Sequence, residues 1–143
     1  MQIANIIADR SAQDIVSCEA STSVSEAVSL LAEKRIGALP VIRDGSVLGI
    51  ISERDVIYKV ASHGRACLDG PVEAIMTSPA ITVEPATTVD EALALMTRRR
   101  FRHFPVVEGG ALVAFISIGD LVKTRISEVE TEAAAMRDYI QTI

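Results

Sequence analysis

The chain has 143 residues, of which 49% are apolar, and it carries a net charge of −5. The acidic balance and an aromatic content of 3% argue against a general nucleic-acid-binding protein, which needs basic and stacking side chains. No apolar stretch approaches the ~18 residues of a membrane span, and the first residues lack a signal-peptide pattern. We therefore expect a cytoplasmic globular protein without a membrane segment.

The first half of the sequence predicts a β-α-β-β-α unit. Its expected elements are a strand at 14–18, a helix at 23–36, strands at 39–42 and 47–52, and a helix that begins at Ser52. Ser23 and Glu26 have the spacing of a capping box at the start of the first helix. Asp44-Gly45 between the two strands is typical of a hairpin turn.

The same order of elements returns 65 residues later. Thirteen of the 45 pairs between residues 16–60 and 81–125 are identical, which indicates a duplication. The expected elements are a strand at 80–84, a helix at 88–101 with a Thr88/Glu91 capping box, strands at 104–107 and 111–117, and a helix from Ser117. Related short segments, 3–8 and 72–77, precede the two copies. We expect two halves, 1–62 and 71–125, joined by a loop at 63–70.

Residues 126–143 continue the last helix with no proline or glycine. Apolar residues step by four and three along it, at Val122, Ile126, Val129, Ala133, Met136, Ile140 and Ile143. This spacing predicts an a/d seam about three heptads long. Two interpretations remain open: the helix packs back on its own repeats, or it supports an oligomer.

The two copies together resemble a pair of cystathionine-β-synthase-type domains, the CBS pair or Bateman module of stand-alone bacterial-type proteins. The resemblance rests on "IMTSPAITVEPATTVDEALALM", "RIGALPVIRDGSVLGIISERDVI" and "RFRHFPVVEGGALVAFISIGDLV". It implies an α+β fold in which two pseudo-symmetric β-α-β-β-α repeats pack sheet to sheet. It also implies two clefts that bind adenosine-containing ligands such as AMP, ADP, ATP, S-adenosylmethionine or NAD(H).

The Ser-x-x-Asp that opens the second helix of each copy has two interpretations. A serine at the N-cap with an aspartate three residues later is close to a capping box, so Ser52 and Asp55, like Ser117 and Asp120, can serve the helix alone. The resemblance adds a second role, because the family places its ribose-binding aspartate at this position. An ionised carboxylate can accept from both ribose hydroxyls, so capping and binding are compatible.

The resemblance also implies two unequal clefts. For the cleft at Asp120 it implies Ser117, Gly119, Arg102 and His103, with walls from Val16, Ile36, Gly37 and Ala38. For the cleft at Asp55 it implies Ser52 and Arg54, with walls from Thr77, Ile81, Phe101 and Arg102. Because guanidinium and imidazole groups donate to phosphates, we expect Arg102 and His103 to contact the phosphates of the ligand.

Other polar and thiol residues have simpler interpretations. We expect Arg98, Arg99 and Arg100 to form a solvated helix end and His63 to be a solvated loop residue. The two cysteines are too few for a disulfide framework or a zinc site, and Cys18 is expected to be a buried thiol.

The sequence therefore favours a nucleotide-binding regulatory protein that senses energy or redox state and acts through a protein partner or self-association, with a homodimer expected. The alternative is a structural module in which one or both clefts are vestigial. We expect no enzyme activity, catalytic cofactor, metal site or nucleic-acid partner, because no catalytic or metal-ligand motif is present.

Overall fold

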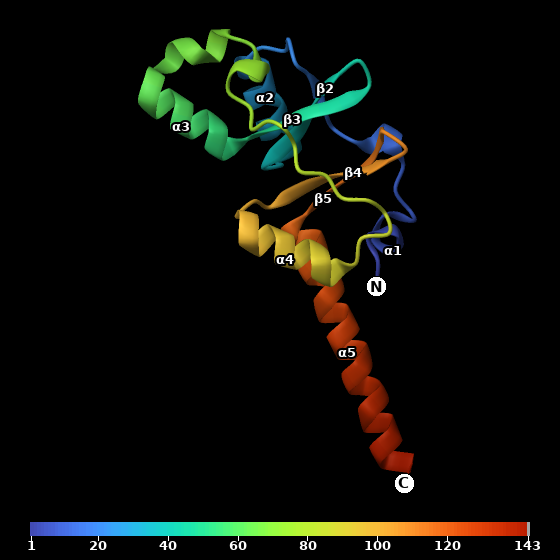
Figure 1. Ribbon diagram of the computed structural model, residues 1–143. Helices are drawn as coiled ribbons and strands as arrows, with labels where there is room; N and C mark the ends of the chain where they lie inside the picture. The colour runs from blue at the N-terminus through green and yellow to red at the C-terminus, as the bar shows by residue number, and fades with distance from the viewer. Residues whose placement is uncertain (143) are drawn as a thin grey trace.

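The computed structural model describes residues 1–142, which form a β-α-β-β-α half, an α-β-β-α half and a long C-terminal helix (Figure 1). The first half contains β1 (Cys18–Glu19), α2 (Val24–Lys34), β2 (Ala38–Arg43), β3 (Ser46–Ser52) and α3 (Glu53–His63). The second contains α4 (Val89–Arg99), β4 (His103–Glu108), β5 (Ala111–Ser117) and α5 (Ile118–Thr142). A short helix α1 (Ile3–Ile7) and 3₁₀ turns at Ala12–Asp14, Arg65–Asp69 and Val72–Ala74 complete the chain. The predicted α+β fold is confirmed.

Both hairpins form as predicted and repeat one register. β2 and β3 pair antiparallel with Leu39 opposite Ile51, and β4 and β5 pair with Phe104 opposite Ile116. Both sheets carry a bulge at the same place, between residues 41 and 42 and between 106 and 107. Each two-residue turn has positive φ throughout (51° and 78° at Asp44-Gly45, 59° and 82° at Gly109-Gly110), which is the conformation of a type I′ turn.

The predicted strands at 14–18 and 80–84 are wrong in extent. β1 holds only Cys18 and Glu19, which pair parallel with β2, and in the second half only Val83 bridges to β4. Asp14 ends a 3₁₀ turn instead, and in the second segment only Val83 has a bridge before a turn begins at Pro85. The residues just before Cys18 and Val83 therefore form no strand, and several of them line the clefts instead.

Helix caps agree with the predictions in part. Thr88 and Glu91 form the reciprocal capping box of α4. In α2 the Ser23 hydroxyl accepts from the Glu26 amide at 3.1 Å, but the described residues contain no return bond from the Glu26 carboxylate. Only half of that predicted box forms. The first helix of each half buries one apolar face, with Val24, Ala27, Leu31 and Val89, Ala92, Met96 in the core.

The segments that precede the two repeats are exchanged between the halves. The Ile3 amide donates to the Thr87 carbonyl, so α1 packs on the second half, and Ile3 is buried in that core. The Val72 amide donates to the Thr22 carbonyl, and Val72 is buried in the core of the first half. Each half is thus completed by the segment that lies before the other half in the sequence.

Two small cores stabilise the molecule, one in each half, and β3 and β5 lie together where the two sheets meet (Figure 1). The fully buried Leu39 and Phe104 occupy equivalent core positions. Gly49 in β3 has a steric role, because a Cβ there would lie 2.5 Å from the Thr77 carbonyl oxygen. Cys18 is buried as predicted; burial, aided by Glu19, raises the pKa of its thiol to about 11.

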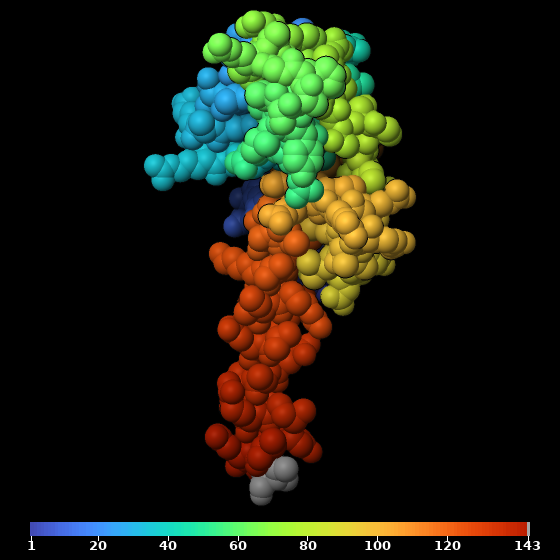
Figure 2. Space-filling model, turned by 90° about the vertical axis from the view of Figure 1, so that its left-hand side faces the viewer, coloured from blue at the N-terminus to red at the C-terminus, as the bar shows by residue number. Residues whose placement is uncertain are grey.

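The C-terminal helix does not pack back on the repeats along its length. Among the described residues of α5 only Leu121 is buried, and the helix projects from the body (Figures 1 and 2). Ile143, the last residue of the predicted seam, lies outside the described residues. No helix in residues 1–142 is both long and apolar enough to cross a membrane.

Candidate functional site

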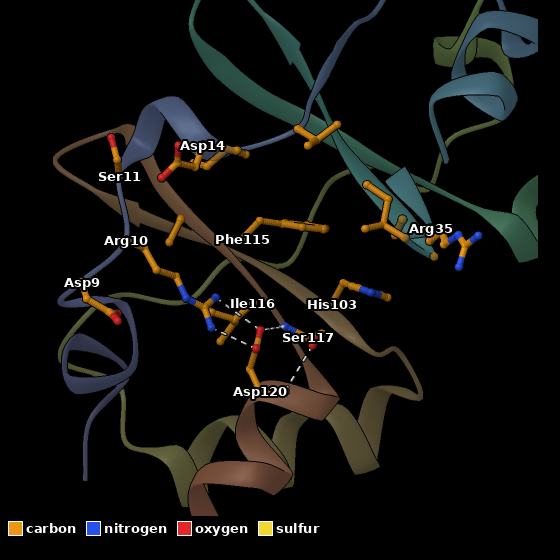
Figure 3. Close-up of a pocket in the computed structure, with 16 residues that line it drawn as sticks. Asp9, Arg10, Ser11, Asp14, Arg35, His103, Phe115, Ile116, Ser117 and Asp120 are labelled. Atoms are coloured by element: carbon orange, nitrogen blue, oxygen red, sulfur yellow. Dashed lines mark hydrogen bonds and ion pairs between the residues drawn. The ribbon is translucent and has the colours of Figure 1, made fainter. Parts of the chain in front are cut away.

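Two clefts open between the halves, and each lies at the start of a helix that the Ser-x-x-Asp opens. The Asp120 cleft has a volume of about 510 Å³ (Figure 3). It is lined by Asp9, Arg10, Ser11, Asp14, Ile15, Val16, Arg35, Ile36, Gly37, Ala38, His103, Ala114, Phe115, Ile116, Ser117 and Asp120. The 3₁₀ turn and the extended segment before β1 form one side of this cleft, which is why the shortened first strand matters for the site.

The Asp120 carboxylate is held by its helix start and by Arg10, which lies just after the exchanged N-terminal segment 3–8. It accepts from the Ser117 amide at 2.9 Å, while the Ser117 hydroxyl accepts from the Asp120 amide at 3.2 Å. Arg10 donates to both carboxylate oxygens, at 2.9 and 3.4 Å (Figure 3). Burial alone would raise the pKa of Asp120, but the bonds from Arg10 and Ser117 outweigh it and the pKa lies below its ordinary value. The carboxylate is therefore ionised near neutral pH.

The Asp55 cleft has a volume of about 550 Å³. It is lined by Gly37, Ala38, Ile50, Ser52, Glu53, Arg54, Asp55, Ile57, Tyr58, Thr77, Pro79, Ala80, Ile81, Arg100, Phe101, Arg102 and His103. One Asp55 oxygen accepts from the amide and the hydroxyl of Ser52, each at 2.9 Å, and the other accepts from the Thr77 hydroxyl at 3.0 Å. The side chains that donate to the Asp55 carboxylate are thus neutral hydroxyls, whereas the side chain that donates to the Asp120 carboxylate is a charged arginine.

Most residues expected in the Asp120 cleft come together there. Ser117, His103, Val16, Ile36, Gly37 and Ala38 all line it with Asp120. Arg102 and Gly119 do not: Arg102 lines the other cleft, and Gly119 is exposed on the first turn of α5. Arg102 immediately precedes β4, and neighbouring side chains of an extended chain point to opposite sides, so Arg102 and His103 do not share all their surroundings.

Every residue expected in the Asp55 cleft lines it, namely Ser52, Arg54, Thr77, Ile81, Phe101 and Arg102. Gly37, Ala38 and His103 line both clefts, so they lie where the two clefts meet. A Cβ added to Gly37 would lie 3.5 Å from the His103 ring, which is an ordinary contact. The His103 ring stacks on Phe115 with centroids 5.5 Å apart.

Sequence reasoning missed several lining residues. Arg10 and Tyr58 carried no recognised signal, although Arg10 lies two residues after the segment 3–8 that the exchange brings to the second half. Arg100 was expected at a solvated helix end, but it caps α4 with a positive φ of 60° and lines the Asp55 cleft. Arg98 and Arg99 are exposed as expected. His63 is exposed, but it is the last residue of α3 and not a loop residue, because the C-cap of the helix is Gly64.

The two clefts differ in charge. Three arginines and two carboxylates line the Asp55 cleft: Arg54, Arg100, Arg102, Glu53 and Asp55. Two arginines and three carboxylates line the Asp120 cleft: Arg10, Arg35, Asp9, Asp14 and Asp120. The Asp55 cleft is therefore the better environment for an anionic group.

His103 is expected to make stability depend on pH. Burial is the largest influence and lowers the pKa of its imidazole; Asp120 and Glu53 oppose this shift and Arg102 adds to it. The unfolded chain then takes up the proton at higher pH than the folded chain, so stability falls as pH drops below about 6.5 and levels off below the folded pKa. The stabilising contribution of Asp120, whose folded pKa is lowered, is lost only in stronger acid.

Melting temperatures measured at intervals from about pH 7.5 to about pH 5.5 check this expectation. The melting temperature of the wild-type protein should decrease more over this pH range than that of the His103→Asn variant. Parallel profiles for the two proteins would contradict the assignment to His103.

The structure is thus a duplicated fold with two clefts between the repeats, and comparison with known proteins identifies its family. The CBS domain family model matches twice, at residues 7–62 and 72–127, so the chain belongs to the CBS domain family. The chain is 36% identical over 129 residues to the mitochondrial CBS domain-containing protein CBSX3 of Arabidopsis thaliana. That match covers 87% of this chain and 63% of the relative, so the chain spans less than two thirds of its length.

Solved structures share the fold along nearly the whole chain. The CBS-domain containing protein ATU1752 from Agrobacterium tumefaciens is 38% identical with a TM-score of 0.82, covering 87% of this chain and 99% of that one. CBSX2, solved in complex with AMP, is 26% identical with a TM-score of 0.74, covering 88% of this chain and 96% of that one. Within residues 1–142 no cluster of three or more His, Cys, Asp or Glu side chains could hold a metal ion.

Proposed function

We propose that this CBS pair is a regulatory protein that binds an adenine nucleotide between its repeats and transmits the bound state to a protein partner or through self-association. The observation that carries the proposal is the pair of aspartates, each anchored at a helix start and each lining a cleft with apolar walls. The AMP complex of the related CBSX2 supports the class of ligand. AMP, ADP, ATP and NAD(H) all present the required adenosine group.

We propose that the Asp55 cleft binds the adenine nucleotide more tightly than the Asp120 cleft does. Each carboxylate oxygen accepts about two hydrogen bonds, so the oxygen that faces Thr77 keeps a position for a ribose hydroxyl. Ile50, Pro79 and Ile81 offer an apolar wall for the adenine. Arg54, Arg100 and Arg102 supply donors for phosphate groups at the same cleft.

The Asp120 cleft is proposed to bind the same ligand more weakly. A ribose there must compete with Arg10, which already donates to both oxygens of the carboxylate. The additional carboxylates of Asp9 and Asp14 oppose a phosphate group. A vestigial Asp120 cleft is the limiting case of this asymmetry.

Thermal melts in the presence of AMP, ADP, ATP, NAD⁺ and NADH test the proposed function. A ligand at 100 times its dissociation constant stabilises the folded protein by about 2.7 kcal/mol. For a chain of this size we expect the melting temperature to rise by roughly 5–10 °C with at least one of these ligands. Guanosine nucleotides are the matched control. A melting temperature unmoved by every adenine ligand would refute the proposed function.

A further inference from the structure

The exposed apolar face of α5 is the largest feature that the clefts do not use. From residue 126 to 142 every residue except the half-buried Glu128 is exposed. The large seam side chains are accessible to solvent by 53% at Ile126, 49% at Val129, 59% at Met136 and 61% at Ile140. The helix extends away from the body in both views (Figures 1 and 2), and no part of the chain within residues 1–142 covers this face.

We propose that α5 pairs with the α5 of a second copy of this chain as a parallel, in-register two-stranded coiled coil. Burying the seam removes apolar surface from water along about three heptads, which favours association. A second copy is the natural occupant, since a heptad seam is self-complementary and two-fold dimers are the commonest oligomers. The coiled coil involves neither cleft, so this proposal and the proposed nucleotide binding can fail separately.

The seam assigns each residue of α5 a heptad position. Ile126, Ala133 and Ile140 occupy the a positions, and Val122, Val129 and Met136 occupy the d positions. The flanking g positions then hold Arg125, Glu132 and Tyr139, and the flanking e positions hold Lys123, Glu130 and Arg137. These flanking charges determine which orientation of the two helices is favoured.

In a parallel in-register pair, each g residue meets the e residue five positions later on the other helix. Arg125 therefore meets Glu130 of the second copy, and Glu132 meets Arg137 of the second copy. Both contacts join opposite charges, and the two-fold symmetry forms each of them twice. Glu130, Glu132 and Arg137 make no salt bridge within the described residues, so they are available for these contacts. Arg125 already pairs with Glu128 and Asp90 of its own chain, at 3.1 and 3.7 Å, so its contact with Glu130 competes with these pairs.

An antiparallel pair that overlaps along the whole seam has the opposite electrostatics. Aligning Ile126 with Met136 of the second copy places Glu130 against Glu130, Glu132 against Glu132, and Lys123 against Arg137. These three contacts join like charges, which destabilises the pair, and the fourth flanking contact, Arg125 against Tyr139, joins no opposite charges. The flanking charges therefore favour the parallel orientation, in which both bodies lie at the same end of the coiled coil.

Disulfide trapping distinguishes the two orientations. In a Cys67→Ser background, in which the remaining Cys18 is buried, Ile140→Cys places a thiol at an a position and Asp138→Cys places one on the outer face. We expect mild oxidation to convert most of the Ile140→Cys protein to a covalent dimer and to leave Asp138→Cys monomeric on a denaturing gel. Equal cross-linking of both variants, or none in either, would overturn the parallel pairing.

Charge exchange tests the flanking contacts by sedimentation. Glu132→Arg is expected to weaken dimerisation roughly tenfold, because two attractive contacts become repulsive, and adding Arg137→Glu should restore it. Val129→Asp should leave a monomer that keeps the wild-type response to adenine nucleotides. A wild-type protein that is monomeric at about 100 μM, well above common subunit affinities, would overturn the proposal. So would a dimer that Val129→Asp leaves intact.

Discussion

Replacing Phe104 with alanine is expected to lower the free energy of unfolding by about 3–5 kcal/mol. Phe104 is fully buried at the centre of the second core, where its ring meets Phe101 edge-on with centroids 5.4 Å apart. Alanine would leave a cavity that the two-stranded sheet beneath it can close only in part. Domains of this size have a total stability of about 5–15 kcal/mol, so this single change removes a large fraction of it.

Chemical denaturation of Phe104→Ala checks this value, and Leu39→Ala in the first half is the matched variant. Leu39 occupies the equivalent core position and is also fully buried, so a loss of about 2–5 kcal/mol is expected. A loss below about 1 kcal/mol for Phe104→Ala, the range of a surface change, would contradict the two-core description.

Asp55→Ala is expected to weaken AMP binding by about 10- to 150-fold. Losing hydrogen bonds to a charged acceptor costs about 1.5–3 kcal/mol, and each 1.4 kcal/mol is a tenfold change in affinity. Asp120→Ala is the matched control, since it removes the same side chain from the same position of the other repeat. Because Arg10 already donates to the Asp120 carboxylate, we expect Asp120→Ala to change the tighter of the two dissociation constants much less than Asp55→Ala does.

Isothermal titration of both variants measures the two dissociation constants directly. Asp55 also caps α3, so the titration should be run well below the melting temperature of each variant. A larger loss in Asp120→Ala than in Asp55→Ala would reverse the proposed order of the clefts.

The duplication made much of the fold predictable. At an offset of 65 residues, two weak local signals support each other: Asp44-Gly45 is a hairpin turn in its own right, and Gly109-Gly110 at the same place strengthens both assignments. The helix starts at Ser52 and Ser117 were predictable for the same reason. Local turn and cap chemistry depends on a few neighbouring residues, which a single sequence displays.

The exchange of the leading segments could not be predicted from the same offset. The Ile3 and Val72 amides donate to Thr87 and Thr22, respectively, and Ile3 and Val72 are 69 residues apart, so the 65-residue alignment does not pair them. Each segment reaches the other half through tertiary contacts that leave no local pattern. This exchange brings Arg10 to Asp120 and Thr77 to Asp55, and it accounts for the missed arginine.

The sequence predicted which residues lie near the clefts better than it predicted which cleft each charged side chain faces. His103, Gly37 and Ala38 were expected in one cleft and line both, while Arg102 was expected in both and lines only the Asp55 cleft. Arg100 turned to that cleft because its backbone adopts the left-handed conformation at the end of α4. Such side-chain directions depend on backbone torsions at element ends, where sequence patterns are least informative.

The most direct test of the central claim is a titration of AMP into the wild-type chain and into a variant that carries both Asp55→Ala and Asp120→Ala. We predict saturable binding to the wild-type chain and its loss in the double variant, while circular dichroism verifies that the variant remains folded. Binding of equal affinity by a folded double variant would contradict the claim that these two carboxylates hold the nucleotide between the repeats.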